Sequence, residues 1–156
     1  MVDSDDVLLL RPARADSAFT LDGERPPPGA DHGVDRGIVE ATILHLEAPA
    51  AEEILAFFDG EIAPRLAGAS ILAYLVTEQS ENTFPILPVR EGEHVFVWFA
   101  GFADRAAYGA VAGDRAAAMH KAGQAPGLGR APEVLRLAPT SRSLLTGSSH
   151  DSPGGS

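Results

Sequence analysis

The sequence predicts an α+β fold built from short strands and two helices, and three observations support this. Short runs rich in aliphatic and β-branched residues, bounded by glycine, proline or polar clusters, recur along the chain and are typical of strands. Two longer segments place apolar residues at helical spacing instead. With 156 residues and no cysteine, the chain is long enough for one domain with its own core, and no disulfide can hold it.

Residues 1–36 are predicted to form an N-terminal arm and a proline-rich linker. The run DVLLLRP at 6–12 has the composition of a short strand that ends at a proline, and 17–21 is a weaker extended piece. Three consecutive prolines and three glycines make 22–36 an exposed loop. The run EVLRLAP at 133–139 shares the pattern of 6–12. Either the two strands are unrelated, or the arm adds an edge strand to the sheet, in its own subunit or in a partner's.

Residues 37–146 are predicted to form the domain, and 147–156 a disordered tail rich in glycine and serine. A first helix follows Pro49 and is kinked or ended by Pro64, and a second begins after Asp104, whose carboxylate can cap it. Four strands are predicted, at residues 37–47, 70–77, 94–100 and 133–139. The order β-α-β-β-α-β is that of a ferredoxin-like domain with a four-stranded antiparallel sheet.

The predicted strand at 94–100 is apolar on both faces, and this bears on assembly. Side chains alternate along a strand, so its two faces carry different residues. One face holds Val95, Val97 and Phe99, and the other holds Phe96, Trp98 and Ala100. The helices of this fold cover only one face, so we expect a second copy of the chain to cover the other, giving a homodimer that closes into an α/β barrel.

The charge of the chain limits the classes of partner that it can bind. The formal net charge is −10, with a pI near 4.8, which opposes binding to nucleic acid and to anionic membrane surfaces. The chain starts with MVDSDD, where a secretory signal would carry Lys or Arg, so we expect a cytoplasmic protein. Small molecules and protein partners remain.

The segment from Glu81 to Trp98 also resembles a known family. Its runs ENTFP (81–85), LPVREGE (87–93) and VFVW (95–98) resemble proteins of the NIPSNAP type in the dimeric α/β-barrel superfamily. The resemblance covers about residues 37–139. It implies the ferredoxin-like fold and the dimer. The superfamily includes cofactor-independent monooxygenases, decarboxylating or dehydrating enzymes, and proteins of no settled activity.

One departure from the family pattern concerns the first strand of the domain. Family members often begin it with Glu-Leu-Arg-x-Tyr, whereas this chain has EATIL at 40–44. The family's arginine and tyrosine are therefore absent at these positions, and any role attached to them is not carried over.

The densest candidate chemistry lies in the loop and strand at 80–101. Arg90 can clamp a carboxylate or enolate, and His94 can move a proton near neutral pH. Glu93 lies between them in the sequence and is a candidate ligand contact. The alternative is a solvated loop in which arginine and glutamate form surface ion pairs of little energetic value.

Other candidates each have a structural alternative. His45, on an otherwise apolar strand face, is either an acid-base group or a satisfied core histidine. Tyr74 and Trp98 either line a ligand cavity or pack in the core, Tyr74 being a further candidate acid-base group. Asn82 either donates to a developing oxyanion or forms an Asx turn. Phe84, two residues on, completes the predicted ligand-binding set.

No cofactor or metal is predicted. His45, Glu47 and His94 are the one conceivable metal-binding trio, and no spacing signature supports them. Phosphate-loop and Gly-x-Ser-x-Gly patterns are absent from the sequence. Two hypotheses follow. The first is a small cofactor-independent enzyme, similar to a cyclase, isomerase or monooxygenase, acting on a hydrophobic carbonyl- or phenol-bearing metabolite. The second is a non-catalytic module that binds a ligand or a protein.

Overall fold

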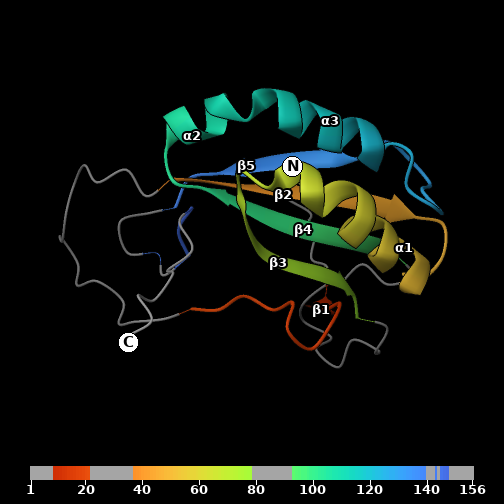
Figure 1. The fold of residues 1–156 in the computed structure, drawn as a ribbon. Coiled ribbons are helices and arrows are strands. Elements are labelled where there is room, and N and C mark those ends of the chain that lie inside the picture. Colours follow the sequence, from red (N-terminus) through yellow and green to blue (C-terminus); the bar gives the residue numbers. More distant parts are fainter. Residues whose placement is uncertain (1–8, 22–36, 79–92, 140–142, 144, 148–156) are drawn as a thin grey trace, which may run out of the picture.

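The computed structural model describes residues 9–21, 37–78, 93–139, 143 and 145–147. They form an α+β fold in which five antiparallel strands make one sheet, with helices packed on one face (Figure 1). The strands are β1 (Leu10–Pro12), β2 (Ile38–Leu46), β3 (Ser70–Thr77), β4 (His94–Phe102) and β5 (Glu133–Leu137). The helices are α1 (Glu52–Phe57), α2 (Arg105–Ala110) and α3 (Ala112–Ala122). The strand order across the sheet is β1-β3-β4-β2-β5.

The long central pair, β2 and β4, sets the register of the sheet. The two strands pair over their whole length, from Ile38 opposite Phe102 to Leu46 opposite His94. β3 flanks β4, and β5 flanks β2. All four strands predicted for the domain are present, β3 with the predicted bounds and β4 two residues longer than expected.

The helices also follow the sequence signals. After α1 the chain continues through a π-helical turn (Phe58–Ile62) and a 3-10 turn (Ala63–Leu66) that contains Pro64. The second predicted helix is divided at Val111 into α2 and α3. The Asp104 carboxylate caps α2 by accepting a hydrogen bond of 2.7 Å from the backbone N–H of Ala107.

The core lies between the helices and the sheet. Phe58, from the turn after α1, is its centre, with ring centroids 5.3 Å from Phe96 and 5.4 Å from Trp98. Its buried members come from β2, β3, β4, the α1 region and α3 and include Leu44, Ile54, Ile62, Val76, Ala118 and Ala122. Trp98 is 3% exposed, so its indole is part of this packing.

The N-terminal arm adds a strand to the edge of the sheet in its own subunit. β1 pairs antiparallel with β3, and the backbone N–H of Glu78 donates to the carbonyl of Leu9 at 2.7 Å. The predicted extended piece at 17–21 is not a strand. It instead brings Phe19 onto Phe99 on the sheet face opposite the helices, with ring centroids 4.8 Å apart.

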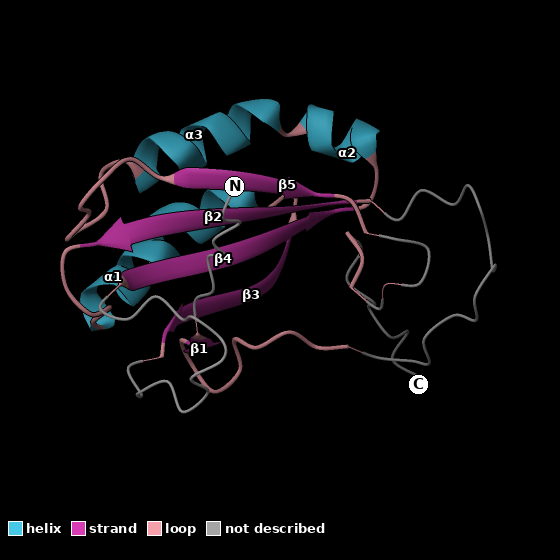
Figure 2. Cartoon of the chain, turned by 180° about the vertical axis from the view of Figure 1, so that it is seen from behind, coloured by secondary structure: helices cyan, strands magenta, loops and turns pink. Residues whose placement is uncertain are grey.

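That opposite sheet face is the one turned toward the viewer in Figure 2. Besides Phe19, Leu145 lies against it, since both Leu145 and Val39 line a shallow hollow at one end of the face. The chain therefore covers part of this apolar face itself. Leu135 and Leu137 of β5 remain 45% and 44% exposed on it.

Within the described residues, no helix combines the length and the apolar character needed to cross a membrane.

Candidate functional site

A buried carboxylate lies at the junction of the sheet with α2 and α3. Glu40 of β2 points toward the helices, and its side chain is 10% exposed. One of its oxygens, Oε2, accepts hydrogen bonds from the hydroxyl of Tyr108 and from Nη2 of Arg115, both at 2.8 Å. Burying a carboxylate costs several kcal/mol unless it is paired and hydrogen-bonded, and these two groups meet that requirement.

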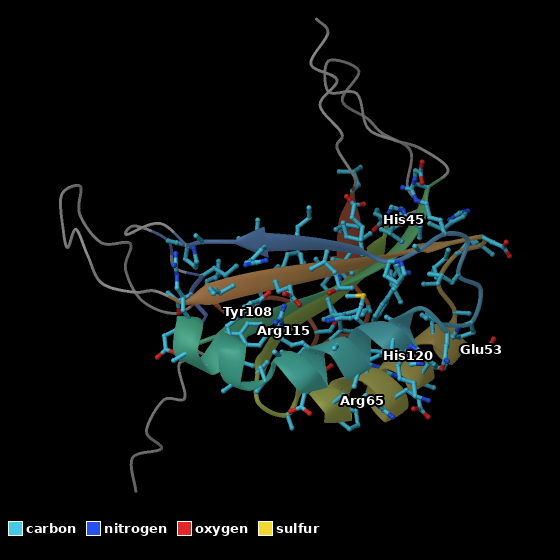
Figure 3. The ribbon with its side chains drawn as sticks, turned by 90° about the horizontal axis from the view of Figure 1, so that it is seen from above. His45, Glu53, Arg65, Tyr108, Arg115 and His120 are labelled. Atoms are coloured by element: carbon cyan, nitrogen blue, oxygen red, sulfur yellow. The ribbon has the colours of Figure 1, made fainter. Side chains whose placement is uncertain are left out.

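Tyr108 and Arg115 also contact each other directly. The guanidinium carbon of Arg115 lies 3.5 Å from the centroid of the Tyr108 ring, and Nη2 of Arg115 contacts the Tyr108 hydroxyl. The two residues are labelled side by side between the sheet and the helices in Figure 3. Glu40, Tyr108 and Arg115 thus form one interlocked polar cluster from three elements.

The environment of Tyr108 favours its neutral form. Burial raises the pKa of the Tyr108 phenol, and the hydrogen bond and negative charge of Glu40 raise it further. The positive charges of Arg115 and Arg136 lower the pKa of Tyr108, but by less than the other causes raise it. The phenol is therefore protonated at neutral pH.

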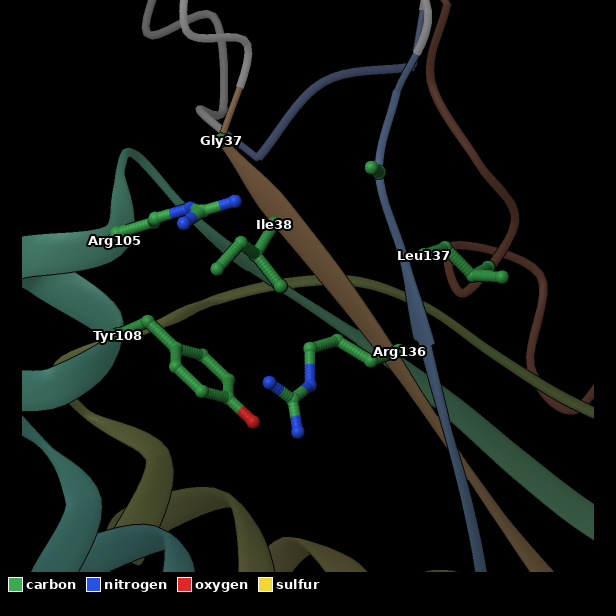
Figure 4. Close-up of a pocket in the computed structure, with 7 residues that line it drawn as sticks. Gly37, Ile38, Arg105, Tyr108, Arg136 and Leu137 are labelled. Carbon is green, nitrogen blue, oxygen red and sulfur yellow. The ribbon is translucent and has the colours of Figure 1, made fainter.

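A pocket of about 440 Å³ opens beside this cluster, between α2 and β5 (Figure 4). Its lining residues are Gly37, Ile38, Arg105, Tyr108, Arg136, Leu137 and Ala138. Figure 4 shows Arg105 reaching in from α2 and Arg136 reaching in from β5. The guanidinium carbon of Arg136 lies 5.3 Å from the centroid of the Tyr108 ring.

The charge balance of this region is unusual for so acidic a chain. Arg115 neutralises Glu40. Among the described residues, Arg105 and Arg136 form no ion pair, and no carboxylate lines the pocket. Two guanidinium groups therefore lie at the pocket without an acidic partner among the described residues, although the net charge of the chain is −10.

Arg90, Asn82 and Phe84 lie outside the described residues. Glu93, directly before β4, is half-buried.

The other predicted residues do not converge on one point. His94, Trp98 and Tyr74 lie on the helix-facing side of the sheet, whereas His45 lies on the opposite side. Figure 3 shows His45 and Tyr108 on opposite sides of the sheet. His94 and Trp98 are four residues apart on one strand, which separates them by about 13 Å. His45 and Tyr74, both candidate acid-base groups, therefore lie on opposite faces of the sheet and cannot act at one site within this chain.

His45 and His94 have different surroundings. Nε2 of His45 lies 3.2 Å from Oε2 of Glu133, and Nη2 of Arg130 lies 3.0 Å from its Nδ1 and 3.2 Å from its Nε2. The in-plane directions of the two ring nitrogens diverge, so Arg130 can satisfy only one of them. His94, at the start of β4, has a buried Nδ1 without a hydrogen-bond partner among the described residues.

Tyr74 belongs to a second polar group. Its ring contacts Phe58 at 5.1 Å between centroids, and burial, followed by the charges of Asp59 and Asp16, raises the pKa of its phenol. Arg14 of the arm lies nearby and forms ion pairs of 3.0 Å with Glu52 and Asp59. These contacts fasten the arm to the α1 region.

The residues of the pocket and its cluster were missed at the sequence level. One signal was available: Glu40 is the single charged residue on a strand face that otherwise carries Ile38, Thr42, Leu44 and Leu46. A lone acid on a buried face requires a buried partner. The described residues hold no group of three or more His, Asp or Glu side chains placed to bind a metal ion.

No protein-family model, no curated protein and no solved structure matches this chain.

Proposed function

We propose that the protein binds a small organic molecule in the pocket between α2 and β5. The observation that carries this proposal is the pocket itself: about 440 Å³, within the usual range of ligand sites, with a few polar groups on an otherwise apolar wall. Its wall is held in place by the interlocked contacts of Glu40, Tyr108 and Arg115. A rigid wall lowers the entropic cost of binding.

The proposal extends to the fold family and the assembly. The element order β2-α1-β3-β4-α2/α3-β5 and the sheet order β3-β4-β2-β5 support a ferredoxin-like domain. The exposed leucines of β5 support a homodimer through the face opposite the helices. Together with the loop motifs, these features support a NIPSNAP-like protein of the dimeric α/β-barrel type.

A second candidate function is cofactor-independent acid-base catalysis on a carbonyl- or phenol-bearing metabolite. It is favoured by the Tyr108 hydroxyl, which adjoins the pocket and is hydrogen-bonded to a carboxylate. A phenol in such a pair can exchange a proton with a bound molecule. Binding comes first in either case, so binding is the property to test.

The test uses defined probes and two matched variants. We would follow amide NMR shifts while titrating benzyl alcohol, phenylacetate and phenyl phosphate. Ala138→Trp puts an indole into the pocket, whereas Leu135→Trp puts one on β5, three residues earlier and outside the pocket. We expect at least one probe to shift the amide signals of residues 105–108 and 136–138. Binding of that probe should be lost in Ala138→Trp and kept in Leu135→Trp. The proposal fails if no probe binds, or if Ala138→Trp leaves binding unchanged.

A further inference from the structure

We infer that the ligand of this pocket is an organic anion, with a carboxylate or phosphate head between Arg105 and Arg136 and an apolar body against Ile38 and Ala138. This inference rests on the proposed function and names the chemical class of the ligand.

The first support is the sign of the charge. Arg105 and Arg136 approach the pocket from two different elements, and none of the described residues that line it is acidic. The Glu40 carboxylate, beside the pocket, already accepts hydrogen bonds from Tyr108 and Arg115. An oxyanion entering the pocket therefore meets two guanidinium groups and no carboxylate among the described residues that line it. Arginine presents paired donors that match the oxygens of a carboxylate or phosphate.

The second support is the way in which Arg136 is held. Its guanidinium lies over the Tyr108 ring, at 5.3 Å from the centroid, which is within the range of a cation–π contact. The ring is fixed in turn by Arg115 on its face and by Glu40 at its hydroxyl. An arginine with a preset position loses less freedom when it binds an anion. Tyr108 is thus a positioning residue for Arg136.

The alternative is that Arg105 and Arg136 are solvated surface arginines with no ligand. Both residues are exposed, as such arginines are. The two explanations differ in one measurable respect. Solvated arginines attract any anion weakly and equally, whereas a site with an apolar wall binds an organic anion more tightly than inorganic phosphate.

The experiment compares probes and arginine variants by isothermal titration calorimetry on the full chain at constant salt. The probes are phenylacetate, phenyl phosphate, inorganic phosphate and the neutral benzyl alcohol. The variants are Arg105→Gln and Arg136→Gln, with Arg11→Gln as the control. Arg11 is an exposed arginine of β1, at the other edge of the sheet, and its replacement changes the net charge by the same amount.

We expect phenylacetate or phenyl phosphate to bind at least tenfold more tightly than benzyl alcohol and inorganic phosphate. Each pocket variant should weaken that binding by ~10- to 100-fold, the usual effect of losing a hydrogen bond to a charged group, and Arg11→Gln should leave it unchanged. If the circular dichroism spectrum of each variant matches that of the parent chain, the weaker binding is not caused by unfolding.

Two results would overturn the inference alone, and they are distinguishable from failure of the proposed function. If benzyl alcohol binds as tightly as the anions and Ala138→Trp abolishes it, the pocket is a ligand site and its ligand is not an anion. If the three arginine variants weaken binding equally, the arginines act only through net charge. If no probe binds at all, both the inference and the proposed function fail.

Discussion

The guanidinium of Arg115 lies on the ring of Tyr108, 3.5 Å from the centroid, and both groups bond the same oxygen of Glu40. This arrangement ties β2 to both α2 and α3. It also fixes the ring that forms one wall of the pocket. The stability of the domain and the shape of its candidate site therefore depend on the same three side chains.

The first prediction concerns the charge pair within this cluster. Arg115→Leu leaves the buried Glu40 carboxylate with only Tyr108 as a partner. We expect the free energy of unfolding to fall by about 3 kcal/mol, at the lower end for a broken buried pair because Arg115 keeps 21% exposure. Urea denaturation monitored by circular dichroism measures this change.

Two further variants make this prediction specific. Glu40→Gln in the Arg115→Leu background removes the stranded charge and should restore part of the loss. Arg65→Leu breaks a more exposed pair with Glu61 and should cost less than about 1 kcal/mol. Equal losses in Arg115→Leu and Arg65→Leu would contradict the role we give to Glu40.

The second prediction is a pH dependence set by the two tyrosines of the chain, Tyr74 and Tyr108. Burial raises the pKa of both phenols, so both should ionise above the ordinary value of about 10. Absorbance of the phenolate at alkaline pH measures this directly. A midpoint at or below 10 for both tyrosines would contradict the surroundings described for them.

The same shifts have a consequence for stability. Between the ordinary pKa and the raised one, the unfolded chain has lost the phenol proton and the folded chain has kept it. Stability is therefore fully present below about pH 10 and falls as the pH rises through the folded pKa values. Tyr108→Phe should reduce the slope of that fall. An unchanged slope in both Tyr108→Phe and Tyr74→Phe would show that neither phenol is linked to folding.

Much of the fold follows from local signals. Residues 70–77 carry a strand pattern with clear ends, and β3 has the predicted bounds. Asp104 is followed by a helix and caps it, as its side-chain chemistry requires. Each of these signals is contained in a few neighbouring residues.

The candidate site, in contrast, depends on contacts between distant residues. Glu40 and Arg115 are 75 positions apart in the sequence. The alternation of side chains in β2 predicts that His45 shares a face with Val39, Ala41 and Ile43. It does not predict which of the two faces meets the helices. That choice is made by tertiary packing, and it separates His45 from Tyr74 and Trp98.

The third prediction concerns the N-terminal arm. The amides of Ala13 and Glu78 donate to the backbone carbonyls of Tyr74 and Leu9, so they should exchange slowly with solvent. Phe19→Ala removes the ring contact with Phe99 and should accelerate exchange at Ala13 more than in the central strands. Hydrogen exchange followed by NMR tests this, and fast exchange at both amides in the parent chain would contradict the pairing of the arm with β3.

The fourth prediction is the homodimer through the sheet face opposite the helices. Leu135 and Val134 are neighbours on β5 with similar exposure, 45% and 41%, and they point to opposite faces. Light scattering at micromolar concentration should give a dimer mass for the parent chain. Leu135→Glu should shift it toward the monomer, whereas Val134→Glu should not. A monomer mass for the parent would contradict the proposed assembly.

The most direct test of the central claim observes the arginine side chains themselves. In a chain labelled with ¹⁵N-arginine, the Nε–H signals are assigned with the arginine-to-glutamine variants and followed during titration with phenylacetate and phenyl phosphate. We predict that one of these anions shifts the signals of Arg105 and Arg136 with a common saturation curve, while Arg14 and Arg65, which are engaged in ion pairs elsewhere, stay unchanged. Shifts spread evenly over all four arginines, or no shift at Arg105 and Arg136, would contradict an anion site between α2 and β5.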